Sequence, residues 1–313
     1  MAAEELGYAR FSAAEGWTHD AVVLLAQIAG ATSRIGLATG VLPVWSRTPA
    51  AIAMAAASLQ RASDGRFALG LGASSPPLME GLHGIVWERP VGRMRSTLVA
   101  VRALLDGARL PLDRERVRPL RLGAPPVSRV PIHLAALAPS SVRLAGELAD
   151  HWLPFLWARS RLGDGRNLLA EGEALAENPS ATGVTVSVPL AIGRDEATAH
   201  RIAAGWLLAY LTRMGPLYPR MLRARFGFGH EVDALLGANG SGGPPRLPAA
   251  AERLARDVTV MGTYDEAPDV VRLWLEQGAD AIELVLPPEL PEEQLHEMLE
   301  AAAPSVRARS TRV

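Results

Sequence analysis

Short apolar runs of strand length alternate with longer amphipathic stretches along most of the chain, and this alternation constrains the fold more than any other feature. The first residues after the runs often carry helix-start signals, such as the hydroxyl and proline of Thr48-Pro49. Strands that alternate with helices predict a parallel sheet covered on both faces. Seven strands are predicted, at residues 8–13, 34–41, 66–72, 131–136, 151–156, 184–192 and 281–286.

Eight strand–helix units would close a TIM (β/α)8 barrel, and the count is one short of that number. Because Ala2–Gly7 resembles the last turn of a helix, we expect that the first strand of the barrel is lacking at the N-terminus, through a misassigned start or a real truncation. An open, doubly wound sheet is the alternative, although no glycine-rich turn of the dinucleotide-binding type follows a first strand.

One domain over residues 1–313 is expected, with a helical insertion at about 195–256 and a disordered tail at about 305–313. Near the C-terminus, Thr263 and Glu266 have the spacing of a capping box. The helix that they would start is predicted to run to Gln277, with Gly278 as the residue that ends it.

The composition excludes several classes of function. The net charge of −1 argues against a nucleic-acid binder, and the absence of cysteine excludes disulfides and cysteine metal sites. No lysine is present, which excludes a Schiff base and a P-loop lysine. The seven histidines lack metal-ligand spacing. Without a membrane-length apolar stretch or a signal-peptide pattern, we expect a cytoplasmic protein, and composition alone indicates no more than a soluble globular enzyme or binding protein.

Small residues dominate the predicted strand ends, which is where a parallel barrel carries its functional site. Small side chains allow the backbone to approach a ligand closely, so the pattern suits a large flat ligand. The helix start at Pro139-Ser140-Ser141 could hold a phosphate, with ordinary capping as the alternative. The strand-end candidates are Thr39, Gly40, Val41, Gly72, Ala73, Ser74, Ala135, Ala136, Leu137 and Ala138.

Few strand-end side chains can do acid–base chemistry. Glu15 could hydrogen-bond a ring or transfer a proton, or it could simply pair with an arginine. Trp17 could form a stacking wall of a substrate pocket or belong to the core. His83, in a loop with Glu80, could donate to a cofactor or substrate or have only a structural role.

Five strings of residues together resemble the bacterial luciferase-like superfamily of flavin and deazaflavin oxidoreductases. They are residues 32–41, 46–50, 63–74, 80–84, and 131–137 with 146–150. The most similar branch is its coenzyme F420-dependent members, which are related to methylenetetrahydromethanopterin reductase. The resemblance covers almost the whole chain, and the joint match is specific although each string is weak.

This resemblance implies a TIM barrel of the luciferase-like type that holds F420, or alternatively FMN, at the carboxyl ends of its strands. It implies a cis peptide bond at Gly40-Val41 next to the ring, contacts from Gly72, Ala73 and Ser74 to the cofactor side chain, and a phosphate-binding turn at residues 135–138. Glu15 matches an acidic position that faces the cofactor. Ala138 and His151 stand where the branch usually has glycine.

Three functions follow as hypotheses. The first is hydride transfer between F420 and a small organic substrate, with Glu15 and His83 as catalytic residues and Trp17 and Glu80 in the substrate pocket. The second is an FMN-dependent monooxygenase, and the third is a non-catalytic barrel that binds a ligand or partner. The apolar residues Trp206, Leu207, Tyr210, Met214 and Met221 could form a homodimer interface or pack on their own barrel.

Overall fold

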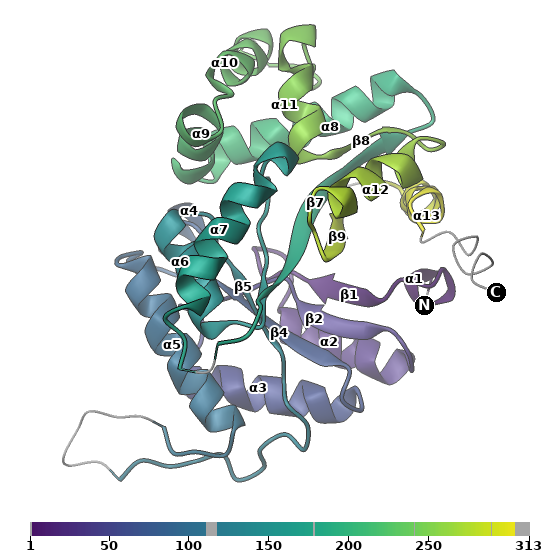
Figure 1. Ribbon diagram of the computed structural model, residues 1–313. Helices are drawn as coiled ribbons and strands as arrows, with labels where there is room; N and C mark the ends of the chain where they lie inside the picture. Colours follow the sequence, from purple (N-terminus) through teal and green to yellow (C-terminus); the bar gives the residue numbers. More distant parts are fainter. Residues whose placement is uncertain (1, 111–117, 178, 241, 289, 304–313) are drawn as a thin grey trace. The chain divides into compact units, whose positions relative to one another are not determined.

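The computed structural model describes residues 2–110, 118–177, 179–240, 242–288 and 290–303 (Figure 1). The predicted disordered tail at 305–313 lies outside the described residues. Backbone proximity divides the chain into two compact units. Unit 1 comprises Ala9–Leu153 and Asn167–Gly183, and unit 2 comprises Ala2–Tyr8, Pro154–Arg166 and the chain from Val184 onward. The single domain and the helical insertion expected from the sequence stay predictions.

Unit 1 is built on a parallel sheet, so the carboxyl ends of its strands lie at one edge (Figure 1). The register pairs Phe11 with Leu37 and Leu69 with Ile132. All six residues of β4 are buried, as expected for a strand covered on both faces. The strands, in hydrogen-bonding order, are β1 (Arg10–Ala13), β2 (Gly36–Thr39), β4 (Phe67–Gly72), β5 (Ile132–Ala135) and β6 (His151–Trp152), and β3 (Leu42–Pro43) also pairs with β4.

Helices follow these strands, and α2 and α3 begin at capping residues that the sequence provides. The Asp20 carboxylate accepts hydrogen bonds from the first amides of α2, and the Thr48 hydroxyl caps α3 ahead of Pro49. Helix α3 packs against both α2 and α5, and α5 packs against α6 (Figure 1). The helices are α2 (Ala21–Ala31), α3 (Pro49–Ala62), α4 (Pro76–Gly81), α5 (Pro90–Leu105), α6 (Pro139–Leu148) and the part of α7 (Leu162–Glu173) from Asn167 onward.

Unit 2 is organised around the long strand β7 (Gly183–Gly193). It pairs in parallel with β8 (Val260–Thr263) through Leu190–Gly193 and with β9 (Ala281–Val285) through Thr185–Pro189. The helices here are α1 (Ala2–Glu5), α8 (Glu196–Arg213), α9 (Leu217–Arg220), a π-helical turn (Met221–Arg225), α10 (Gly229–Ala238), α11 (Glu252–Val258), α12 (Ala267–Glu276) and α13 (Glu292–Ala301), with 3₁₀ turns at Arg159–Arg161 and Ala249–Ala251.

The seven predicted strands are present. Four of them are one or two residues shorter than predicted, β2 and β6 are four residues shorter, and β7 is two residues longer. The strand count was wrong because β3 and β8 were not predicted. Thr263 ends β8, and α12 begins at Ala267, so the predicted capping box is not the start of this helix. One of the two capping-box hydrogen bonds is present, because the Glu266 carboxylate accepts from the Thr263 amide as well as from its hydroxyl. The reciprocal bond is not, because the Glu266 amide donates to the Thr263 carbonyl at 3.2 Å. Gly278 has φ +101° just beyond α12, which confirms its predicted role in ending the helix.

Aromatic residues of α8 pack inside unit 2. The Tyr210 ring centroid lies 4.7 Å from that of Phe155 and 4.9 Å from that of Tyr218. Packing on the same chain was the alternative to a dimer interface, and the homodimer itself stays a prediction. Within the described part of the chain, no helix has both the length and the apolar character needed to cross a membrane.

Candidate functional site

The ends of β1 and β2 meet at a cis peptide bond between Gly40 and Val41, the bond that the resemblance implied. The Gly40 amide donates to the Ala13 carbonyl at 2.8 Å, and the Val41 carbonyl accepts from the Glu15 amide at 3.1 Å. These two hydrogen bonds place Glu15 directly beside the cis peptide, at the strand edge where a barrel carries its site.

Thr39, also predicted as a cofactor contact, has its hydroxyl engaged with the protein. The hydroxyl hydrogen-bonds the Gly70 amide and carbonyl, both at 2.8 Å, and the residue is 1% exposed. A Cβ at Gly70 would lie 1.9 Å from the Thr39 carbonyl oxygen, so glycine is required for this approach of β2 to β4. Thr39 therefore joins two strands.

The Glu15 carboxylate is surrounded by donors. It accepts from the Arg47 guanidinium, the Ser46 hydroxyl at 3.2 Å and the Ala21 amide at 3.3 Å. Arg47 also contacts Asp20 at 2.6 Å. Burial alone would lower the pKa of the Arg47 guanidinium. The hydrogen bonds and negative charges of Glu15 and Asp20 have the larger effect together, so the pKa is raised. The geometry therefore makes Glu15 a fixed partner of Arg47 and Ser46, as in the arginine-pairing alternative.

A hollow of about 350 Å³ brings three predicted site residues together. Glu15 forms part of it, Trp17 lines it with an indole that is 64% exposed, and the exposed His83 lies in the same lining. Glu80 is not part of the lining, and its carboxylate accepts from the Trp87 amide at 3.2 Å. The complete lining is Glu15, Gly16, Trp17, Thr18, His19, Asp20, Ser46, Arg47, Leu82 and His83.

Arg47 and Ser46 are the candidate functional residues that the sequence reasoning did not select. Both lie in the string 46–50 that contributes to the resemblance. The sequence did contain a signal for Arg47. Glu15 and Asp20 both follow the first strand, and two carboxylates that are partly buried there require a cation as a partner.

The loop after β4 carries Gly72, Ala73 and Ser74. A Cβ at Gly72 would lie 2.9 Å from a Val41 methyl and 3.2 Å from the Ala135 Cβ, so this glycine makes room for neighbouring side chains. Ser74 adopts a left-handed conformation with φ 58°. Its amide has no hydrogen-bond partner among the described residues, and a left-handed residue can turn such an amide toward an anion.

The helix that follows β5 begins with a second amide that has no hydrogen-bond partner among the described residues. The Ala136 carbonyl accepts from the Trp152 indole at 2.8 Å, which fixes the turn that contains Leu137. Ala138 precedes α6 and cannot cap it with a side chain, and the Ser140 amide has no partner in the described part of the structure. Free amides at a helix start attract anions.

These two loops are neighbours, because Gly72 pairs with Ala135 in the sheet. The structure thus places two amide donors in segments that follow neighbouring strands, Ser74 in the loop after β4 and Ser140 in the first turn of α6, and the cis peptide lies on the β2 side of β4. This donor set fits a cofactor with an anionic side chain. All the predicted cofactor contacts stay predictions. They are Glu15, Thr39, Gly40, Val41, Gly72, Ala73, Ser74 and residues 135–138.

Two histidines, of which His133 is buried, lie side by side on β5 and β6. The His133 ring is 2% exposed, lies 4.7 Å from the His151 ring and has its Nε2 3.5 Å from an Arg10 nitrogen. Burial first, and then the charges of Arg10 and His151, lower the pKa of His133 to about 3 against the opposing effect of Asp150. His133 is therefore a neutral core residue at pH 7. A Cβ at Gly183 would lie 2.5 Å from the His151 ring, so glycine at 183 accommodates this histidine.

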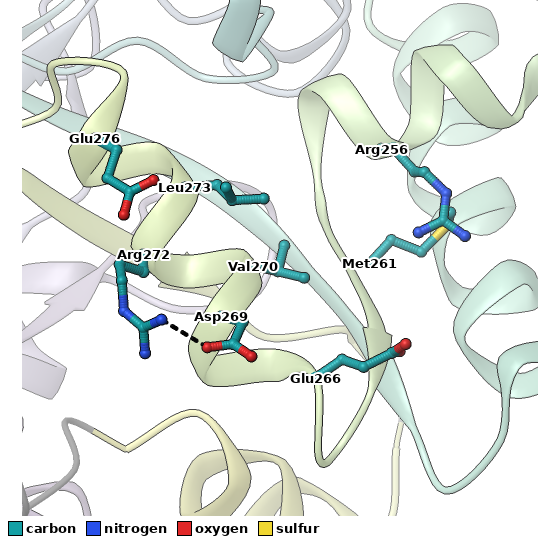
Figure 2. Close-up of a pocket in the computed structure, with 8 residues that line it drawn as sticks. All are labelled: Arg256, Met261, Glu266, Asp269, Val270, Arg272, Leu273 and Glu276. Carbon is teal, nitrogen blue, oxygen red and sulfur yellow. Dashed lines mark ion pairs between the residues drawn. The ribbon is translucent and has the colours of Figure 1, made fainter.

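Another hollow, of about 260 Å³, lies in unit 2 between α11, β8 and α12 (Figure 2). None of the predicted site residues lines it. Both of its arginines are paired: Arg272 with Asp269 at 2.8 Å and Arg256 with Glu252 at 2.7 Å. The described residues contain no group of three or more acidic or histidine side chains that could hold a metal ion.

Comparison with known proteins identifies the family of this chain. The family model described as "luciferase-like monooxygenase" matches residues 1–281. The chain belongs to the luciferase-like monooxygenase family. A protein of Mycobacterium tuberculosis named "putative coenzyme F420-dependent oxidoreductase" is 31% identical to it over 305 residues, covering 88% of this chain and 86% of that protein.

Two solved structures show that this luciferase-like chain has the predicted fold. One is the coenzyme F420-dependent tetrahydromethanopterin reductase of Methanopyrus kandleri, with a TM-score of 0.72, 19% identity and coverage of 96% of this chain and 91% of that one. The other is the oxygenating constituent of 3,6-diketocamphane monooxygenase from Pseudomonas putida in complex with FMN, with a TM-score of 0.64, 18% identity and coverage of 97% and 90%. The predicted fold class is confirmed.

Proposed function

We propose that this luciferase-like protein is an oxidoreductase that transfers a hydride between coenzyme F420 and a small organic substrate. The observation that carries the proposal is a pair of amides with no hydrogen-bond partner among the described residues, on Ser74 in the loop after β4 and on Ser140 in the first turn of α6, with the cis Gly40-Val41 bond on the β2 side of β4. The similarity to the Mycobacterium tuberculosis protein favours F420 as the cofactor. Bound deazaflavin supplies the hydride chemistry, and the protein supplies binding, orientation and exclusion of water.

The residues of unit 1 divide these tasks. The Ser74 and Ser140 amides would hold the anionic side chain of the cofactor, with the α6 N-terminus contributing its partial positive charge. The Gly40-Val41 peptide would lie next to the ring. Glu15 orients Arg47 and Ser46 along one wall of the hollow, while Trp17 and His83 line it as candidate contacts for a small-molecule substrate.

The test uses Ala138→Asp with Ala138→Ser as its matched control. Both side chains can cap α6, and an N-cap adds about 0.5–2 kcal/mol of stability, but only aspartate places a negative charge where the anionic side chain would bind. In fluorescence titrations we expect A138D to raise the dissociation constant for F420 at least tenfold and A138S to change it much less. Failure of the folded wild-type protein to bind F420 would refute the proposal.

An FMN-dependent monooxygenase is the second candidate function, favoured by the fold shared with the FMN-bound Pseudomonas putida structure. The same two amides would then hold the FMN phosphate. Tighter binding of FMN than of F420, with consumption of oxygen in the presence of reduced FMN, would decide for this function. Binding of neither molecule by a folded protein would favour a non-catalytic barrel.

A further inference from the structure

Two tryptophan side chains converge on one backbone oxygen in the loop after β4. The Trp87 indole donates to the Ala73 carbonyl at 2.8 Å, and the Trp45 indole donates to the same oxygen at 3.1 Å. Trp45 follows β3 and Trp87 precedes α5, so two separate segments fix one peptide of the loop. A carbonyl oxygen has two lone pairs, and both are used here.

Each indole has its own support. The guanidinium carbon of Arg93 lies 5.3 Å from the centre of the Trp45 ring, and the Arg93 Nε donates to the Val44 carbonyl at 3.3 Å. The Trp87 amide donates to the Glu80 carboxylate at 3.2 Å. Glu80, predicted for the substrate pocket, thus helps to hold the loop that presents Trp87.

The position of this carbonyl determines the direction of the next amide. In a trans peptide the C=O and N–H groups point in opposite directions. Because the indoles hold the Ala73 carbonyl, the Ser74 N–H of the same peptide points away from them. This is the amide that has no partner among the described residues. The paired carbonyl oxygen also has no free lone pair to turn toward an anion.

We propose that Trp45 and Trp87 are positioning residues that clamp the Ala73–Ser74 peptide, so that the Ser74 amide faces the anionic side chain of the bound cofactor. This inference rests on the proposed function, since it assigns the Ser74 amide to the cofactor. The two indoles act through the peptide and need not touch the cofactor. Their contribution is the orientation of the Ser74 donor before the cofactor binds.

The experiment compares Trp45→Phe, Trp87→Phe and the double variant with Trp274→Phe. Each change keeps an aromatic ring and removes one indole N–H. Trp274 is a matched control, because it is fully buried in unit 2 and its indole nitrogen has no hydrogen-bond partner in the described structure. Folding of each variant is checked by circular dichroism, and F420 binding is measured by fluorescence titration.

We expect each single loop variant to raise the dissociation constant for F420 about three- to tenfold, because one charge-assisted amide contact loses its fixed direction. The double variant should bind more weakly than either single variant, and W274F should bind like the wild type. Turnover at saturating F420 should change less than the dissociation constant. If the tryptophan variants unfold, Arg93→Met provides a milder change that loosens Trp45, with a smaller increase expected.

Unchanged F420 affinity in the folded double variant would overturn the inference and leave the indoles with a purely structural role. An equal loss of affinity in W274F would also overturn it, because general loosening of the protein would then explain the effect. Failure of the proposed function looks different, since the wild-type protein itself would then fail to bind F420 before any variant is compared.

Discussion

Among single residues, Glu15 shows how its neighbours decide what a strand-end carboxylate can do. Its side chain is 9% exposed and pairs with Arg47, whereas Asp20, the second partner of Arg47, is 48% exposed. Removing the charge of a largely buried partner leaves the guanidinium without its main compensation, which costs far more than weakening an exposed pair.

Glu15→Gln is therefore expected to lower the free energy of unfolding by about 1–3 kcal/mol. Asp20→Asn is the matched control, because asparagine is also a good N-cap for α2, and it should cost less than about 1 kcal/mol. Urea unfolding at pH 7 measures both values. Equal losses in the two variants would show that burial of Glu15 does not set the strength of its ion pair.

His133 makes a prediction about pH because its pKa is lowered from 6.5 to about 3 in the folded protein. Above pH 6.5 this histidine is neutral in both states, and its contribution to stability is fully present. As the pH falls through 6.5, His133 becomes protonated in the unfolded chain, whereas in the folded protein it is protonated only near pH 3. The free energy of unfolding therefore falls with decreasing pH in this window, by at most about 1.4 kcal/mol per pH unit for one proton.

We expect His133→Leu to flatten this pH dependence relative to the wild type between pH 6.5 and 4.5. Exposed His230 offers the control, since His230→Asn should leave the slope unchanged. Urea unfolding at several pH values measures the slopes. A slope that His133→Leu leaves intact would mean that other groups cause the acid sensitivity.

Among the elements, α6 and α7 approach so closely that two glycines are required. A Cβ at Gly146 would lie 2.2 Å from the Leu169 carbonyl oxygen, and one at Gly172 would lie 2.0 Å from the Arg143 carbonyl oxygen. Each helix thus presents a glycine to the backbone of the other. These contacts lie within unit 1 and hold α6, whose N-terminus carries the Ser140 amide.

Gly146→Ala is expected to destabilise the protein by about 1–3 kcal/mol, because the backbone must move to admit the methyl group. Gly30 in α2 has no neighbour within 4 Å of its added Cβ, so Gly30→Ala should be neutral or stabilising by up to about 1 kcal/mol. Thermal unfolding measures both. Destabilisation of the same size at both positions would contradict the role of close helix packing.

The elements that the sequence predicted well are those with a strong local signal. The apolar stretch of β4 and the Thr48-Pro49 start of α3 are examples. Strand β8 was missed because its four residues directly follow the end of α11, and the spacing of Thr263 and Glu266 predicted a helix start instead. The clamp on Ala73 could not be predicted, since its donors come from positions 28 and 14 residues away and only the fold brings them together.

At the scale of the whole molecule, all the site residues predicted from the sequence lie in unit 1. Strand ends were predictable because parallel strands place their carboxyl ends at one edge. The partners of Glu15 and the amides without a partner could not be predicted from the sequence, because they depend on the orientation of side chains and peptides. Unit 1 is therefore the part of the molecule in which cofactor binding should be detected.

Hydrogen–deuterium exchange with and without saturating F420 tests this expectation. A ligand that binds only the folded state suppresses local opening where it makes contact. We expect protection at residues 39–47, 72–75 and 135–141, and little change along α8 in unit 2, which serves as the internal reference. FMN provides the matched comparison, because its phosphate would protect the amides of Ser74 and Ser140 in the same way. Protection confined to unit 2 would place the cofactor elsewhere and contradict the assignment of the strand-end loops.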